Sequence, residues 1–127
     1  MEEKKQVPVG LSDFRDFFNE NAPCYYVDKT PFIKELVTTS LFSSPANLVL
    51  RPRRFGKTLM LSMLQNFFDM DAKDARPIFK NLEIGKDTAF CEKYENRFPV
   101  ISITFKDVKG DTMEKMLTEL HLKLFSE

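Results

Sequence analysis

The chain has 127 residues, of which 43% are hydrophobic and 30% are charged, a balance typical of one globular domain with a real core. Its 19 basic residues equal its 19 acidic residues, which argues against bulk electrostatic binding of nucleic acid. Neither cysteine belongs to a Cys-x-x-Cys pair and the single histidine has no neighbouring ligand, so a zinc site is not expected. No apolar run approaches ~18 residues, and no apolar stretch follows the charged N-terminus, so we expect a cytoplasmic chain without a membrane span.

The N-terminal part divides into a charged tail and the start of a domain. Residues 1–8 are predicted to be disordered, and residues 9–127 to form the domain. A helix is expected after Asp13, which is a plausible N-cap, and a short extended segment over residues 24–27. The apolar face of this first helix consists of Phe14, Phe17 and Phe18.

The middle of the chain reads as helix, strand, loop and helix. Thr30 is a candidate N-cap and Pro31 suits the first position of a helix. A turn over residues 43–47 precedes an apolar run, residues 48–50, that predicts a buried strand. After Gly56 the apolar residues recur at the spacing of one buried helix face: Leu59, Met60, Met63, Leu64, Phe67 and Phe68.

The last third of the chain repeats the strand-then-helix order. Residues 74–80 predict a short helix broken by Pro77, and Asp87 is placed to cap a brief helix that ends at Tyr94. Residues 98–105 are rich in β-branched and aromatic side chains and predict an interior strand. A final helix has one apolar face, made of Met113, Met116, Leu117, Leu120 and Leu124.

This order of elements predicts an α/β fold, a partial P-loop NTPase three-layer sandwich in which parallel strands are flanked by helices. Two long strands are fewer than a doubly wound sheet has, so we expect these residues to be the first part of a larger domain. Such a chain leaves a sheet edge or an apolar helix face uncovered. We therefore expect it to associate with itself through that surface.

The loop between the central strand and the following helix has the layout of a phosphate-binding loop. The usual pattern is G-x-x-x-x-G-K-[ST], and here Arg51 occupies the first glycine position. Gly56 permits close approach of the backbone, and Lys57 is expected to reach the terminal phosphates. The hydroxyl of Thr58 is expected to bind Mg²⁺ that arrives with the nucleotide.

The residues around this core of the loop complete the predicted nucleotide site. Arg53 and Arg54 can add charge-assisted contacts to phosphates, or can form an exposed basic rim. The same arginines leave open a second interpretation, a nucleic-acid-binding segment. Phe55 and Leu59 are expected to pack beside the loop.

A hydrolytic P-loop enzyme also needs an acidic residue for the metal, usually at the end of an apolar strand. Asp107 is the only candidate at such a position, and the alternative for it is a turn aspartate. The cluster of Asp69, Asp71 and Asp74 is interpreted as a solvated helix end. A module that keeps the loop without turnover therefore stays open as an alternative to an enzyme.

Three stretches resemble the bacterial AAA-ATPase-like family, which is similar to the AAA and STAND-type P-loop ATPases. These stretches are residues 25–30, residues 51–64, and the strand region with Phe98-Pro99-Val100-Ile101-Ser102 and Phe105-Lys106. In that family an arginine in place of the first glycine is usual, so Arg51 agrees with the pattern. The resemblance extends from about Val9 to Glu127.

The resemblance implies ATP and Mg²⁺ as ligands, with Gly56, Lys57 and Thr58 carried over as the phosphate and metal residues. It also implies that the Tyr26–Lys29 turn lies near the adenine. Family members are longer and often carry a C-terminal domain similar to PD-(D/E)xK nucleases. The resemblance thus implies an ATPase for the full-length protein, inactivity of this part alone, and nucleic-acid contacts only through domains outside this chain.

Overall fold

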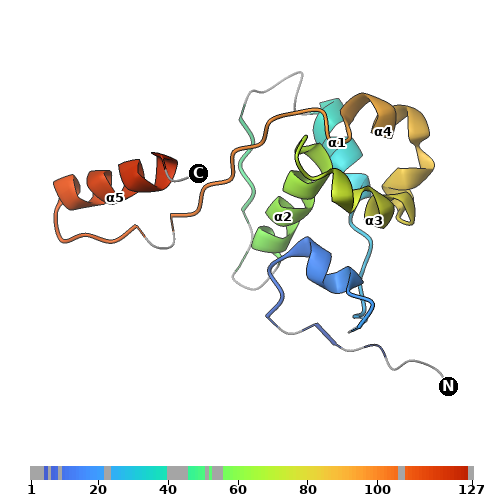
Figure 1. The fold of residues 1–127 in the computed structure, drawn as a ribbon, viewed down its shortest axis with the longest axis horizontal. Coiled ribbons are helices and arrows are strands. Elements are labelled where there is room, and N and C mark those ends of the chain that lie inside the picture. The colour runs from blue at the N-terminus through green and yellow to red at the C-terminus, as the bar shows by residue number, and fades with distance from the viewer. Residues whose placement is uncertain are drawn as a thin grey trace.

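The computed structural model describes residues 5, 7–8, 10–21, 24–39, 46–50, 52, 56–105 and 108–125. The helical segments in this part are η1 (Phe14–Phe18), α1 (Pro31–Thr39), α2 (Lys57–Phe68), η2 (Lys73–Ala75), α3 (Arg76–Lys80), η3 (Glu83–Lys86), α4 (Thr88–Tyr94) and α5 (Met113–Phe125), where η denotes a 3₁₀ helix. Figure 1 shows one body that contains the elements from η1 to α4, and α5 well apart from it. Within the described ranges, no helix has the length and apolar character needed to span a bilayer.

Helix starts follow the capping signals of the sequence. The Asp13 carboxylate accepts a hydrogen bond from the Arg15 N–H at 3.0 Å where η1 begins. Asp87 accepts one from the Phe90 N–H at 3.1 Å where α4 begins. Both predicted caps are confirmed. The helical stretch expected over residues 74–80 is divided beside Pro77 into η2 and α3, and the proline lies in the first turn of α3, where its missing N–H costs no helical hydrogen bond.

The core is a cluster of phenylalanine rings contributed by several helices. Phe67 of α2 is fully buried, and its ring centroid lies 5.2 Å from that of Phe79 in α3 and 6.0 Å from that of Phe90 in α4. Phe14 of η1 stacks on Phe79 at 5.1 Å. These elements are short, so long-range ring contacts rather than helix propensity supply most of their stability.

The C-terminal end of α2 is held by Asn96. The side-chain amide of Asn96 donates to the backbone carbonyls of Asn66, at 3.2 Å, and Asp69, at 2.7 Å. Its backbone N–H donates to the Phe67 carbonyl at 2.7 Å, and its side-chain oxygen accepts from Nε of Arg76. Asn96 is buried and has a φ of 52°. One residue therefore satisfies carbonyls that the end of a helix leaves without partners.

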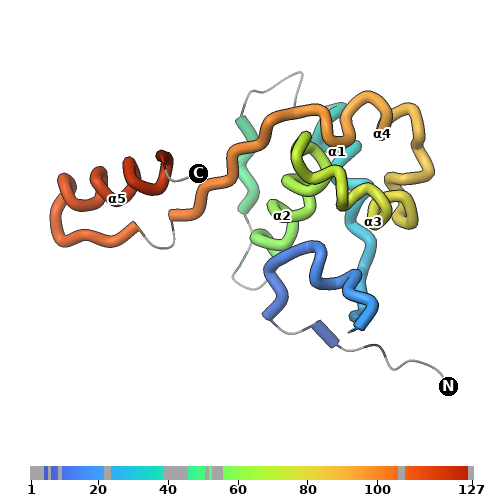
Figure 2. Tube along the Cα trace, viewed as in Figure 1, coloured from blue at the N-terminus to red at the C-terminus, as the bar shows by residue number. Residues whose placement is uncertain are grey.

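The predicted parallel sheet is absent from the part of the chain that the structure describes. Residues 46–50 and 99–105 run as extended chain without a strand ladder (Figure 2). An isolated parallel bridge joins Asp69 to Phe98, just before the second of these segments. The predicted fold class, an α/β three-layer sandwich, is therefore wrong for this structure. The described chain is mainly helical.

The exposure of the two apolar runs gives the physical reason for this difference. Leu48 is 84% exposed, Leu50 is 80% exposed and Ile101 is 81% exposed, so the side chains expected inside a sheet face solvent. A parallel strand is stable when neighbouring strands and covering helices bury both of its faces. An apolar run shows that a segment can be buried, but not whether partners are present to bury it.

Candidate functional site

The candidate site begins at the N-terminus of α2. Gly56, the residue before the helix, has φ 79° and ψ 22°, the left-handed conformation that L side chains rarely adopt. A Cβ added there would meet no atom within 4 Å. Glycine is therefore favoured by the backbone conformation and not by crowding. Lys57 and Thr58 are the first two residues of the helix.

The structure places part of the predicted nucleotide loop. The residues Arg51, Arg53, Arg54 and Phe55 lie outside the described residues. Lys57 and Thr58 are exposed, whereas Leu59 is half-buried and packs against the core. The first N–H groups of an α-helix have no intrahelical acceptor and lie at the positive end of the helix dipole. This end of α2 therefore presents donors and one lysine toward solvent, the requirement for binding an anion.

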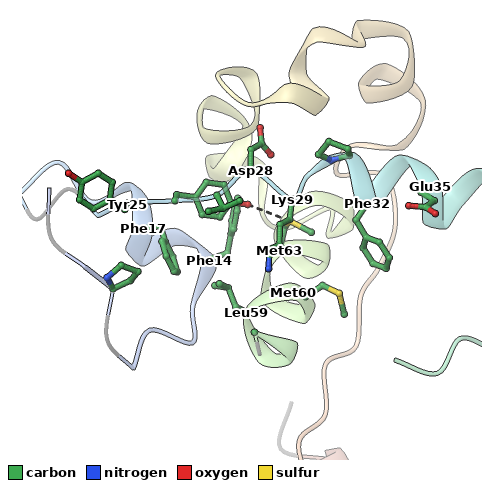
Figure 3. A pocket seen from close by; sticks show the side chains of 15 residues that line it. Phe14, Phe17, Tyr25, Asp28, Lys29, Phe32, Glu35, Leu59, Met60 and Met63 are labelled. Atoms are coloured by element: carbon green, nitrogen blue, oxygen red, sulfur yellow. Dashed lines mark hydrogen bonds between the residues drawn. The ribbon is translucent and has the colours of Figure 1, made fainter. Parts of the chain in front are cut away.

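A cavity of about 450 Å³ lies beside this helix end. Figure 3 shows its walls, formed by η1, α1, α2 and the segment that contains Tyr25. The apolar lining includes Phe14, Phe17, Tyr25, Phe32, Met60 and Met63. Lys29 extends toward α2, and Asp28 points away from it (Figure 3). Aromatic and thioether surfaces with a few charged groups at the margin suit a flat, partly polar ligand.

A second cavity of about 750 Å³ adjoins the first at the helix end. Its lining includes Ser12, Lys57 and Thr58. The residues common to both linings are Pro8, Phe17, Gly56 and Leu59. The two cavities thus meet at Gly56; the first is lined mainly by apolar side chains, several of them aromatic, and the second by the start of α2 and residues before η1. This arrangement offers room for a ligand with an apolar end and an anionic end.

The segment of residues 24–30, which forms part of the cavity wall, is hydrogen-bonded to η3, far away in the sequence. One carboxylate oxygen of Asp28 accepts from the Thr30 N–H at 2.9 Å and the Thr30 hydroxyl at 2.6 Å, and the other accepts from the Glu83 N–H at 2.7 Å. The Thr30 hydroxyl, fully buried, also accepts from the Ile84 N–H at 3.2 Å. The Thr30 side chain therefore joins α1 to η3, and Thr30 directly precedes Pro31, the first residue of α1, where the sequence predicted a helix start.

The hydrogen bonds of the Asp28 carboxylate make the free energy of unfolding depend on pH. Burial opposes ionisation of Asp28, but hydrogen bonds from Thr30 and from the Glu83 N–H outweigh it and lower the pKa of the carboxyl. The resulting stabilisation is complete above the unfolded pKa, about 4. This stabilisation is lost as the pH falls through the pKa of Asp28 in the folded protein, which is lower than in the unfolded chain. Because Asp28 is exposed and solvent screens its charge, Asp28→Asn should lower the free energy of unfolding by only about 0.5–1 kcal/mol at pH 7, and the difference should shrink in acid.

Urea unfolding at neutral and acidic pH measures this effect. The matched control is Asp16→Asn, the same substitution at an exposed position in η1. A loss for Asp28→Asn that is equal at both pH values, or equal to that of the control, would contradict the role of the carboxylate.

Comparison with known proteins gives a family. The family model described as "Predicted AAA-ATPase" matches residues 8–127. The chain belongs to this predicted AAA-ATPase family. A curated relative, the "Uncharacterized protein in vnfD 5'region" of Azotobacter chroococcum mcd 1, is 34% identical over 104 residues, which cover 80% of this chain and 17% of the relative. The chain thus spans about a sixth of the length of that relative. No solved structure matches.

Two of the acidic residues singled out in the sequence, Asp69 and Asp74, lie away from the start of α2. Asp69 is the C-cap of α2, at the opposite end of the helix, and Asp74 forms a two-pronged ion pair with Arg15 at 2.6 and 3.0 Å. Asp107 lies outside the described residues. Among the described residues, no group of three or more histidine, cysteine or acidic side chains could hold a metal ion.

The Cys91 thiol packs against the core in a setting that disfavours its thiolate form. Burial, with smaller effects from the charges of Glu95 and Asp87, raises the pKa of Cys91 to about 11. The Cys91 thiol donates to the Ile84 carbonyl at 3.3 Å. The thiol therefore stays protonated at neutral pH and helps to hold α4 against η3.

Most residues that line the first cavity were not predicted from the sequence. Phe14 and Phe17 were expected to be ordinary core residues, yet both also line the first cavity. The available signal was indirect: the family resemblance implied that the Tyr26–Lys29 turn lies near a base, and these residues do line the cavity that reaches Gly56. The contribution of η1 had no local sequence signal, because it depends on packing between segments about 40 residues apart.

Proposed function

We propose that this chain binds a nucleoside triphosphate, with ATP as the ligand, at the start of α2. The observation that supports it most directly is the meeting of two cavities at Gly56, one mainly apolar with several aromatic side chains and one lined by Lys57 and Thr58. The family is described as a predicted AAA-ATPase, which agrees with this class of ligand.

The phosphates are assigned to the cavity lined by the first turn of α2. Its N–H groups and the positive end of the helix dipole attract a polyanion, and Lys57 adds a compact positive charge. Gly56 leaves the space around its Cα open, so a phosphate can approach the backbone closely. Arg53 and Arg54 directly precede this turn in the sequence and are proposed to add charge at the phosphate end.

The base is assigned to the aromatic cavity. Phe17 and Tyr25 offer ring surfaces for stacking, and Lys29 lies at the margin between this cavity and α2. The volume of about 450 Å³ lies within the range of small-molecule pockets.

The metal in this proposal is Mg²⁺ carried by the phosphates. Thr58 is the residue that would hold it, because its hydroxyl lies on the exposed first turn beside Lys57 and oxygen is the ligand that Mg²⁺ prefers. When bound, Mg²⁺ neutralises phosphate charge. The proposal for this chain is nucleotide binding, since hydrolysis would need an additional acidic residue at the metal.

Calorimetric titration with Mg-ATP tests the proposal. Lys57→Ala should weaken ATP binding about 10- to 100-fold, because a charge-assisted contact to phosphate is worth about 1.5–3 kcal/mol. Lys73→Ala in η2 is the matched control and should leave the affinity unchanged, since Lys73 lies near the other end of α2. Circular dichroism of both variants verifies the fold.

A second titration separates the two ends of the ligand. Inorganic triphosphate should bind more weakly than ATP, because it leaves the aromatic cavity empty. Equal binding of the two ligands would contradict the base assignment. Equal ATP binding by Lys57→Ala and Lys73→Ala, or no binding by the folded wild-type chain at millimolar ATP, would contradict the proposed function.

A further inference from the structure

The C-terminal helix α5 stands outside the packed body. Figures 1 and 2 show it at the end of a long extended segment, clear of the helices from η1 to α4. None of its 13 residues is buried. Met113 is 73% exposed, Leu117 is 56% exposed and Leu124 is 48% exposed. An amphipathic helix with this much exposed apolar surface has a face that needs a partner.

Four apolar residues of α5 form a narrow stripe at coiled-coil spacing. Met113, Leu117, Leu120 and Leu124 follow one another at intervals of four, three and four residues. At roughly 100° per residue, these four side chains lie on one side of the helix, and Leu122 lies on the opposite side. Glu114 and His121 border the stripe along the same flank.

We propose that α5 is a self-association surface whose partner is α5 of a second copy, packed antiparallel. The stripe is self-complementary in this direction. Met113 faces Leu124 of the partner subunit, and Leu117 faces Leu120 of the partner subunit. The two-fold axis repeats both contacts, so every residue of the stripe has an apolar partner. Such an isologous interface closes on itself as a dimer.

The charges beside the stripe select this direction. In an antiparallel pair the same flank of both helices comes together, which brings Glu114 next to the partner's His121, twice per dimer. These groups form a hydrogen bond, or an ion pair when the imidazole is protonated. In a parallel pair this flank meets the opposite flank, which carries Met116 and Lys123, and Glu114 then faces no basic residue at the same level. Charge complementarity therefore favours the antiparallel arrangement.

Sedimentation equilibrium of the 127-residue chain across a wide concentration range tests the proposal. A short two-helix interface should give a weak dimer, so the apparent mass should rise with concentration toward twice 14.8 kDa. Leu117→Glu should weaken the dimer at least about tenfold, because it places a carboxylate in the apolar stripe. Leu122→Glu, the same change on the other side of the helix, should leave the dimer unchanged.

A charge exchange and a cross-link test the direction. His121→Glu alone should weaken the dimer, and addition of Glu114→Lys should restore it. In a Cys24→Ser, Cys91→Ser background, mixed Met113→Cys and Leu124→Cys chains should form disulfides between unlike chains. A monomer at all concentrations, equal effects of the two leucine changes, or cross-links between like chains only would overturn the proposal.

Discussion

Phe67→Ala should lower the free energy of unfolding by about 3–5 kcal/mol, the usual cost of emptying a buried phenylalanine site. Phe67 is fully buried, and its ring contacts those of Phe68, Phe79 and Phe90. These rings belong to three helices that are too short to be stable alone, and the void closes only if these helices shift from their packed positions. Thermal unfolding followed by circular dichroism should show a midpoint lower by about 10–20 °C.

Phe105→Ala is the control for this prediction. It deletes the same atoms from a side chain that is 66% exposed, and it should change stability by less than about 0.5 kcal/mol. Similar midpoints for the two variants would show that the ring cluster is not the stabilising core. The proposed ATP site depends on the same cluster, because Phe14 packs on Phe79 and also lines the aromatic cavity.

Asn96→Ala should cost about 2–4 kcal/mol in the free energy of unfolding. The change removes two hydrogen bonds to the end of α2, deprives Arg76 of an acceptor, and places alanine at a φ of 52°. The Asn66 carbonyl loses its side-chain donor in a buried setting, which accounts for most of the cost, whereas the Asp69 carbonyl still accepts from the Ala72 N–H. Urea unfolding with an unchanged m-value measures the loss.

Two further variants separate the contribution of the Asn96 hydrogen bonds from that of its positive φ. Asn96→Gly also loses the side-chain hydrogen bonds but tolerates positive φ, so it should be more stable than Asn96→Ala by about 1 kcal/mol. Asn81→Ala removes one exposed hydrogen bond, to the Pro77 carbonyl, and should cost less than about 1 kcal/mol. A loss for Asn96→Ala as small as that for Asn81→Ala would contradict the proposed clamp.

The sequence predicted the elements whose causes are local. Asp13 and Asp87 cap the helices that they were expected to cap, and the Pro31 and Gly56 signals mark the starts of α1 and α2. The apolar spacing after Gly56 also predicted that Met63 and Phe67 would be buried. Each of these inferences needs only a few neighbouring residues, because caps and periodicity act within one or two turns.

The sheet and the cavity could not be predicted in the same way. Leu48 and Ile101 have the composition of strand residues, but strand formation depends on neighbours that a local pattern does not show. The Asn96 clamp and the Asp28 tie join residues far apart in the chain, and neither has a sequence motif. Of the candidate site, the start of α2 was predictable, and the aromatic wall beside it was not.

The tie from Asp28 and Thr30 to Glu83 and Ile84 also sets an order of folding. Its hydrogen bonds close loops of 55 and 54 residues, so the chain must lose considerable entropy before they form. During synthesis the Gly56 turn leaves the ribosome before Glu83 and Ile84 do, and the wall beside it cannot be fixed until they follow. The aromatic cavity therefore forms late, and a nascent chain that ends before Ile84 carries the turn without its binding pocket.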